Sequence, residues 1–251
     1  MERTKTGVKG LDEILKGGIP KNSVVLVSGA AGSGKTILGL QFLVNGAVEF
    51  GERGLFVTFE ESRNDVTSQA LQFGWDLEKL ESEGKLKIMT FVPSKHHLSY
   101  INSEIDSAID EFKPQRLVYD SISTIGVYAE VIADVETLMN LGLKKEDVTI
   151  HLPPETVTRR AVMDIMGKLK SADITSLVIS ELPKQSSYLS RDTISEFIAD
   201  GIVLLHCLEK KEKKIRAVEV LKMRRTEHSM DLVPMIISER GIEVLVGEKV
   251  Y

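Results

Sequence analysis

The chain has 251 residues, of which 42% are hydrophobic and 27% charged, and its formal net charge is −5. This composition allows a packed core and excludes a disordered protein, and the negative charge argues against a broadly basic surface for duplex binding. The single cysteine, Cys207, excludes an intramolecular disulfide and is expected to be buried in a strand. No apolar run approaches the ~20 residues that span a bilayer and the N-terminus has no apolar leader, so a cytoplasmic protein is expected.

The first predicted elements lead into a phosphate-binding loop. A short helix is expected within residues 6–20, ended by a glycine pair, and a buried strand over 24–28 follows it. Residues 29–36 have the pattern G-x-x-x-x-G-K-T, and an apolar helix over 37–43 follows. Backbone N–H groups and a helix N-terminus in this pattern hold the phosphates of a nucleoside triphosphate. The predicted nucleotide contacts are Gly29, Ala30, Ala31, Gly32, Ser33, Gly34, Lys35, Thr36 and Ile37.

Two side chains of this loop have specific predicted roles. Lys35 is expected to reach the β- and γ-phosphates, and the Thr36 hydroxyl is expected to bind Mg²⁺. The alternative is a glycine-rich turn with an incidental Lys-Thr pair, which the flanking strand and helix disfavour.

The later elements predict the fold class. Strands are expected over 55–59, 86–91, 116–120 and 176–180, with helices over 64–73, capped by Gly74, and over 100–112. This alternation predicts an α/β fold with a mostly parallel sheet flanked by helices. Antiparallel strands over 199–208 and 215–223, then a hairpin of 236–238 and 242–245, are expected to close the chain as one domain, 1–251.

Four carboxylates follow predicted strands. Asp120 ends an apolar strand in the Walker B arrangement and is expected to hold the Mg²⁺ shell, although it could instead cap the next helix. Glu60 and Glu61 follow the strand over 55–59, where one carboxylate can orient and deprotonate the attacking water. From spacing alone they are equally well a solvated acidic pair at a helix start. Glu181 is either a γ-phosphate sensor or a structural residue.

The basic and histidine clusters give weaker signals. The run 222–225, Lys-Met-Arg-Arg, is by itself typical of a solvated turn. His96 and His97 have no partner at metal-ligand spacing and are expected in a surface loop. His206 alternates with apolar strand residues and is expected to be structural.

Several segments together resemble the KaiC-type ATPases of the RecA/RadA superfamily. The resemblance extends over almost the whole chain and is specific for KaiC-type domains. The segments that carry it are Thr6-Gly-Val-Lys-Gly-Leu-Asp12 with Gly17-Gly-Ile-Pro20, Phe59-Glu-Glu-Ser62, Val118-Tyr-Asp-Ser121, the run 195–205, and Val220-Leu-Lys-Met-Arg-Arg-Thr-Glu-His228.

The resemblance implies a RecA-like P-loop core, ATP and Mg²⁺ as ligands, and a homo-oligomeric ring, commonly a hexamer. It implies that Glu60 and Glu61 form the catalytic pair. The lysine and arginine of the family's K-x-R motif reach the γ-phosphate of a neighbouring subunit, which carries this role to Lys222 and Arg224. His228 becomes a candidate contact to the neighbour's nucleotide.

One segment departs from the family. About thirty residues, 126–158, follow the Walker B strand where family members pass quickly into a helix, and the apolar spacing over 131–139 predicts an amphipathic helix there. In RecA-like rings this segment corresponds to the first pore-facing loop, and 183–193 to the second. The insertion is expected either to bind an unknown protein partner or to pack on its own domain.

Three functions remain open at this point. The favoured one is an oligomeric, ATP-hydrolysing regulator or assembly factor of KaiC type. A recombinase-like ATPase acting on single-stranded DNA would need a basic pore with aromatic residues, for which Lys184, Tyr188 and Arg191 are weak candidates, and the acidic insertion argues against it. A scaffold with little turnover is the third, and the intact glutamate pair and K-x-R motif argue against it.

Overall fold

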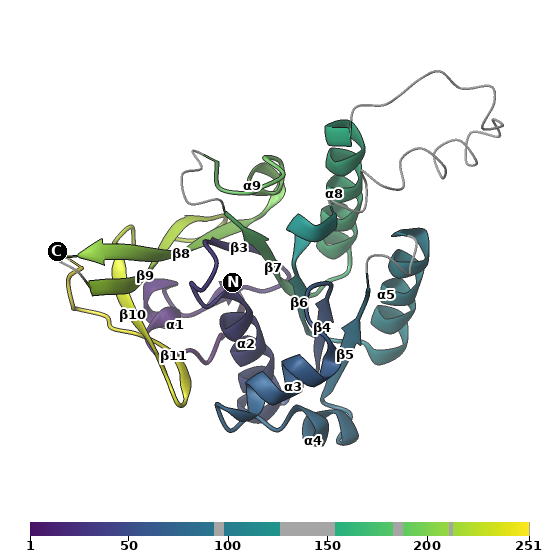
Figure 1. Cartoon of the computed structure of the whole chain (residues 1–251), viewed down its shortest axis with the longest axis horizontal. Helices are drawn as coiled ribbons and strands as arrows, with labels where there is room; N and C mark the ends of the chain where they lie inside the picture. Colours follow the sequence, from purple (N-terminus) through teal and green to yellow (C-terminus); the bar gives the residue numbers. More distant parts are fainter. Residues whose placement is uncertain (93–97, 126–153, 183–187, 211–212, 251) are drawn as a thin grey trace.

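The computed structural model describes residues 1–92, 98–125, 154–182, 188–210 and 213–250. Within them, nine strands form one sheet in the order β11–β10–β9–β8–β3–β7–β6–β4–β5 (Figure 1). The parallel part consists of β3 (Val24–Gly29), β4 (Gly54–Thr58), β5 (Leu86–Thr90), β6 (Arg116–Asp120), β7 (Thr175–Glu181) and β8 (Gly201–Lys210). The antiparallel part consists of β9 (Lys213–Met223), β10 (Val233–Ser238) and β11 (Gly241–Val244). The predicted parallel sheet with late antiparallel strands is therefore confirmed.

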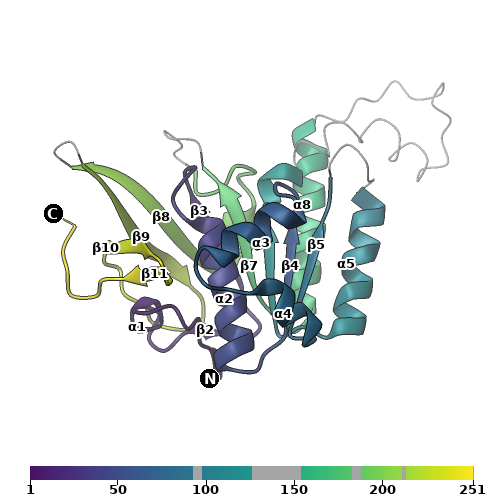
Figure 2. The same cartoon turned by 60° about the horizontal axis from the view of Figure 1, so that its bottom comes forward.

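Helices cover the parallel strands on both faces. One hydrophobic cluster joins the sheet to α1 (Leu11–Ile14), α2 (Lys35–Glu49), α3 (Arg63–Leu71) and α4 (Leu77–Ser82). A second cluster joins the other face to α5 (Leu98–Phe112) and α8 (Pro154–Ser171), with the short α9 (Ser195–Ile198) at its margin (Figure 2). A strand covered on both faces needs apolar residues at every position. In β3 this holds for residues 24–27, because Val25 and Val27 belong to the first cluster while Val24 and Leu26 belong to the second.

The β8–β9 hairpin differs from the rest of the sheet because it extends beyond the helices (Figure 2). Its outer half is therefore open to solvent. Cys207 on β8 is exposed, so the prediction of a buried cysteine is wrong. His206 beside it is half-buried and hydrogen-bonds to Glu219 of β9 at 2.9 Å, which fits the structural role expected of it.

Other boundaries differ from the predictions in small ways. α3 ends at Leu71, earlier than expected, and Gly74 takes a left-handed φ of 75° just beyond it. The sequence reasoning missed the short α4 and the two-residue strands β1 (Arg3–Thr4) and β2 (Ile19–Pro20), which pair with each other. α8 begins at Pro154, so the last five residues of the expected insertion, 154–158, belong to a helix.

Some predicted features lie outside the described residues. These are the amphipathic helix over 131–139, the histidine pair His96–His97, and the part of the second loop that contains Lys184. Within the described residues, no helix combines the length and apolar character that a membrane span requires.

Candidate nucleotide site

The loop over residues 29–36 joins β3 to α2, as the motif predicts. Gly32 and Gly34 have φ values of 76° and 101°, which glycine adopts at little cost. A Cβ at Gly34 would also approach Ile237 Cδ1 of β10 to 3.0 Å. Gly34 is the N-cap of α2, so the helix begins at Lys35 and directs its first N–H groups into the loop. The glycines thus let the backbone form an anion cradle that is packed against β10.

Lys35 lies over this cradle. Its Nζ donates to the carbonyl oxygens of Gly29 at 2.9 Å and Ala30 at 3.0 Å. Burial lowers the pKa of Lys35, and the nearby carboxylates of Glu181, Asp120 and Glu60 oppose that shift. A phosphate oxygen would be a stronger acceptor for this ammonium group than either carbonyl. The lysine is therefore placed to exchange loop carbonyls for phosphate.

Thr36 and Asp120 meet across the sheet edge. The Thr36 hydroxyl donates to Asp120 Oδ2 at 2.7 Å, although β7 separates β3 from β6 in the sheet. Asp120 is buried, and burial raises its pKa to about 7, with repulsion from Glu60 and Glu61 adding to the shift. Among the described residues this carboxylate has no ion-pair partner. Mg²⁺ prefers hard oxygen ligands such as a hydroxyl and a carboxylate whose charge is not already neutralised by an ion pair. Thr36 and Asp120 therefore fit the predicted metal site.

Glu60 and Glu61 follow β4, which pairs with β6 so that Thr58 lies opposite Asp120. The two glutamates have different surroundings. Glu60 Oε1 accepts hydrogen bonds from Ser121 Oγ at 2.5 Å and Thr124 Oγ1 at 3.1 Å, just beyond Asp120. Glu61 Oε2 is buried and has no hydrogen-bond partner among the described residues. Burial raises the pKa of Glu61, and Asp65 and Glu60 add to this.

Glu181 and Asp120 lie at the same edge of the sheet. Glu181 ends β7 directly beside Gly29, and its backbone N–H donates to Ser123 Oγ at 2.9 Å. Its carboxylate also opposes the lowering of the Lys35 pKa by burial, more than Asp120 or Glu60 does. The carboxyl ends of the parallel strands, where ligands of open α/β sheets bind, thus bring together Lys35, Thr36, Glu60, Glu61, Asp120 and Glu181.

Lys222 and Arg224 lie at the other end of the strands. Lys222 pairs with Ile202 at the start of β8, and Gly201 is level with Val25, four residues before Gly29. Four residues of strand span about 13 Å. Both cations contact α9 of their own chain, while His228 lies further on and hydrogen-bonds through Nδ1 to the Ser229 carbonyl at 2.9 Å. The structure therefore does not bring these three residues to the phosphate loop of the same chain.

Three contacts at the site were missed by the sequence reasoning. Arg216 on β9 donates from Nε to the Gly32 carbonyl at 3.2 Å, which places a guanidinium at the rim of the phosphate loop. Ser121 and Thr124 hold Glu60, as described above. Sequence reasoning could not place Arg216 beside the loop, because its neighbours in sequence are typical of a solvated hairpin. Only the pairing of β8 with β9 places it there.

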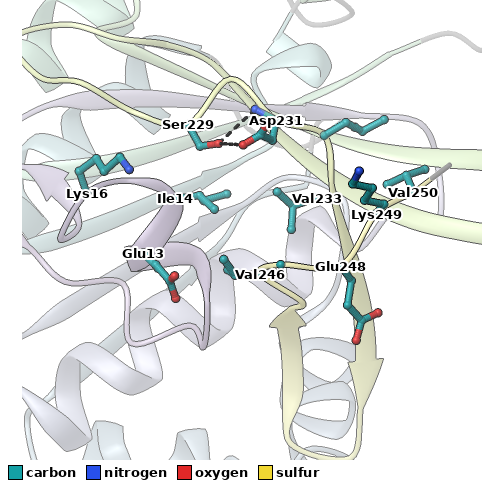
Figure 3. Close-up of a pocket in the computed structure, with 12 residues that line it drawn as sticks. Glu13, Ile14, Lys16, Ser229, Asp231, Val233, Val246, Glu248, Lys249 and Val250 are labelled. Carbon is teal, nitrogen blue, oxygen red and sulfur yellow. Dashed lines mark hydrogen bonds between the residues drawn. The ribbon is translucent and has the colours of Figure 1, made fainter.

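A separate hollow of about 580 Å³ lies between α1, residues 229–233 and the C-terminal segment 246–250 (Figure 3). Its lining mixes apolar side chains such as Ile14 and Val233 with charges of both signs. Ser229 and Asp231 hydrogen-bond to each other at its wall. None of the predicted site residues lines it, so it is distinct from the phosphate loop.

Comparison with known proteins agrees with this arrangement. The family model for the KaiC ATPase matches residues 4–152 and 144–249. The chain belongs to the KaiC family.

Individual relatives extend over the same range of the chain. It is 32% identical over 250 residues to the circadian clock oscillator protein KaiC of Synechococcus elongatus, a match that covers 96% of the chain and 44% of the relative. The KaiC of Parathermosynechococcus lividus is 32% identical over 250 residues, with 42% of the relative covered. The chain thus spans less than half the length of these curated relatives.

A solved structure resembles the chain along its full length. It is the crystal structure of a KaiC-like protein from the hyperthermophilic archaeon Pyrococcus horikoshii OT3, with a TM-score of 0.81 and 34% identity. The match covers 97% of this chain and 99% of that one. The RecA-like fold predicted from the motifs is therefore confirmed.

Proposed function

We propose that the chain is a Mg²⁺-dependent ATPase that works as a homo-oligomer. In this assembly a neighbouring copy supplies residues that complete each nucleotide-binding site. One observation carries this proposal. The phosphate loop, the Thr36–Asp120 pair and the glutamates share one end of the sheet, while the cations of the K-x-R motif lie at the other end. The family membership supports an ATPase domain, and the arrangement supports catalysis between copies.

In this proposal the triphosphate binds over the loop, with its phosphates on the N-terminus of α2 and its β- and γ-phosphates on Lys35. Thr36 and Asp120 would hold Mg²⁺. A bound Mg²⁺ would neutralise charge on the phosphate oxygens and would favour the ionised form of Asp120, whose pKa burial and the neighbouring glutamates raise.

Glu60 is the better candidate for the base that orients the attacking water. It hydrogen-bonds to Ser121, the residue directly after Asp120, whereas the buried Glu61 Oε2 has no hydrogen-bond partner among the described residues. Its Oε1 is held by two hydroxyls, which fixes the carboxylate and leaves Oε2 for water. Glu61 would support Glu60 by holding negative charge behind it.

Lys222 and Arg224 would act on the neighbour's γ-phosphate, with His228 as a further contact to that nucleotide. Positive groups there stabilise charge that develops as the phosphoryl group is transferred. A heterologous contact between copies that repeats around an axis closes a ring, and we propose a ring, commonly a hexamer in this family. The circadian role in the names of the relatives belongs to those proteins.

ATP turnover would then be coupled to ring conformation and to binding of a protein partner. We propose one KaiC-type domain carrying an insertion that begins at residue 126, and the insertion as the partner-binding element. Regulation of this kind needs slow turnover, because the ring must persist in each nucleotide state long enough to bind.

The first test is ATP turnover with Mg²⁺ over a range of protein concentrations. We expect the rate per subunit to rise with concentration and then saturate as copies assemble, and Lys35→Ala to remove turnover. A rate per subunit that is constant down to a proven monomer would refute catalysis between copies. A parallel assay contains single-stranded DNA. Strong stimulation of ATP turnover by the DNA would favour a recombinase-like ATPase over a regulator of KaiC type.

A further inference from the structure

The cations of the K-x-R motif are not loose surface side chains, because both contact the same short helix. Lys222 Nζ donates to the carbonyl oxygens of Glu196 at 3.1 Å and Phe197 at 3.4 Å. Arg224 Nη2 donates to the Phe197 carbonyl at 3.1 Å. The last carbonyls of a helix have no partner within the helix and attract cations. α9 therefore sets where both side chains point.

These contacts leave donors unused. The Lys222 ammonium group has three N–H donors and the Arg224 guanidinium has five. The Arg224 side chain is 48% exposed and has a carboxylate, that of Asp200, 3.6 Å away. Burial and the charge of Arg224 lower the pKa of Lys222. The pair is thus held side by side while N–H groups remain available for an incoming phosphate.

α9 is itself held by Asp192. One Asp192 oxygen accepts from the backbone N–H of Ile194 at 2.8 Å and of Ser195 at 2.6 Å, and the other accepts from Ser195 Oγ at 2.8 Å. Between them, Thr193 has a φ of 59°, an unfavourable value for a β-branched residue. Such a conformation persists only where surrounding contacts fix it. Asp192 makes those contacts.

The segment that leads into α9 is also bound to the catalytic end of the sheet. The Arg191 N–H donates to Ser180 Oγ at 3.3 Å, and Ser180 Oγ lies 3.2 Å from Ser123 Oγ, three residues after Asp120. Glu196 Oε2 accepts from the Leu189 N–H at 2.6 Å and so ties this segment to α9. One end of the segment therefore contacts the chain's own site, and the other end contacts the cations proposed for the neighbour's site.

We propose that Asp192 is a positioning residue for Lys222 and Arg224. By ordering α9 it aligns the two cations before the neighbour's nucleotide arrives. This inference rests on the proposed function, because it concerns catalysis between copies. Without Asp192 the carbonyls of α9 would move, and Lys222 and Arg224 would lose their common orientation. Misplacement of such groups by about 1 Å lowers reaction rates by about 100-fold.

Mixing two inactive chains tests the proposal. The donor chain carries Glu60→Gln and Glu61→Gln, so it lacks its own base but keeps the cations. The acceptor chain carries Lys222→Ala and Arg224→Ala, so it keeps its base but lacks the cations. Turnover in the mixture measures cations of the donor acting on nucleotide bound to the acceptor. Absence of turnover in the mixture, with the unsubstituted protein active, would refute catalysis between copies and the present proposal with it.

Asp192→Ala is then placed in one chain at a time. In the donor we expect it to lower turnover of the mixture about tenfold or more. In the acceptor, whose cations are already absent, we expect a change of less than about twofold. Asp192→Asn in the donor retains an oxygen for the backbone N–H groups and should restore most of the turnover.

The matched control is Asp76→Ala, which removes an aspartate that holds the start of a different helix, α4, by accepting from the Lys79 N–H at 2.9 Å. Asp76→Ala should change the turnover of the mixture by the same factor whether it is placed in the donor or in the acceptor. An equal loss from Asp192→Ala in both positions would show that Asp192 only supports folding and would overturn the proposal. No loss in either position would overturn it as well, and in both cases the proposed function would stand.

Discussion

The carboxyl ends and the amino ends of the parallel strands carry opposite kinds of charge. At the carboxyl ends, Asp120 and the two glutamates crowd together, and burial and mutual repulsion raise the pKa values of Asp120 and Glu61. At the amino ends, Lys222 and Arg224 lie beside a carboxylate, Asp200. Burial opposes ionisation of Asp200, but hydrogen bonds from Lys170 and the Val24 N–H outweigh it and lower its pKa.

This difference has a mechanistic consequence. Phosphoryl transfer needs a base, a metal site and extra positive charge around the same phosphate. The residues proposed for these three roles lie at two ends of the sheet within one chain. Because β3 spans the distance between them, side-chain motion alone cannot bring them together. Two copies stacked with unlike ends facing would meet the requirement. The charge separation within one chain is thus an argument for assembly.

The amino-end cations give the largest expected effect. Arg224→Ala should lower kcat by about 1,000-fold, because removal of an arginine that stabilises the transferred phosphoryl group has effects of this order or more. Nucleotide affinity of the separated chain should not change. Stopped-flow turnover and binding of a fluorescent ATP analogue at low protein concentration measure the two quantities.

Arg225→Ala is the control for this change. It removes the same charge one residue away, from a side chain that contacts Ser23 of its own chain, and it leaves a non-glycine residue at the same positive φ. It should leave kcat within about threefold, as expected for a surface charge. Equal losses in both variants would mean that only the local net charge matters.

The carboxyl-end glutamates should differ from each other. Glu60→Gln should lower kcat by about 100-fold or more, the range for loss of a general base, with little change in nucleotide affinity. Glu61→Gln should have a smaller effect, because Glu61 does not contact the Ser121 and Thr124 hydroxyls. Single-turnover kinetics of both variants checks this order. The reverse order would make Glu61 the base.

Arg216 should have a moderate effect on binding. Its guanidinium lies at the phosphate loop of its own chain and is exposed, so Arg216→Ala should raise KM for ATP by about three- to tenfold with kcat nearly unchanged. Arg160→Ala on α8 should change neither constant, because among the described residues this exposed side chain forms an ion pair with Asp164 alone. A fall in kcat without a change in KM would assign Arg216 to catalysis instead of binding.

The sequence predicted most of the fold because its central strands are covered on both faces. The continuous apolar runs of β3 and β6, alternating with helices, favour a parallel sheet covered on both faces. The short elements β1, β2, α4 and α9 were missed because their formation depends on contacts far along the chain, and no helix was predicted over the range of α8. Cys207 was misplaced for the same reason, since the exposure of β8 depends on how far the helices extend.

For the site, local motifs predicted the side chains that lie at strand ends, and the structure brings Lys35, Thr36 and Asp120 together as expected. The difference between Glu60 and Glu61 was not predictable from spacing, because it depends on Ser121 and Thr124, which come from another strand. Arg216 and Asp192 were missed because each acts through pairing or capping contacts that a sequence does not display.

The smallest effect concerns stability at the carboxyl ends. Burial raises the pKa of Glu61 above its ordinary value of 4.5, so the folded chain binds this proton more tightly than the unfolded chain does. The contribution of Glu61 to the free energy of unfolding is then highest below about pH 4.5 and falls as pH rises through its folded-state pKa. Glutamine does not ionise, so Glu61→Gln does not lose this stability. Relative to the parent, its free energy of unfolding should rise across that pH window by about 0.5 kcal/mol, a small value because the side chain is partly open to solvent. Urea unfolding at a series of pH values measures the difference.

Glu83→Gln is the control and should lose stability relative to the parent as pH rises, because a hydrogen bond and ion pair with Lys85 lower the pKa of Glu83. If Glu61→Gln also lost stability relative to the parent as pH rises, the Glu61 carboxylate would have a partner at this end of the sheet, and the contrast between the two ends would be weaker than the charges imply.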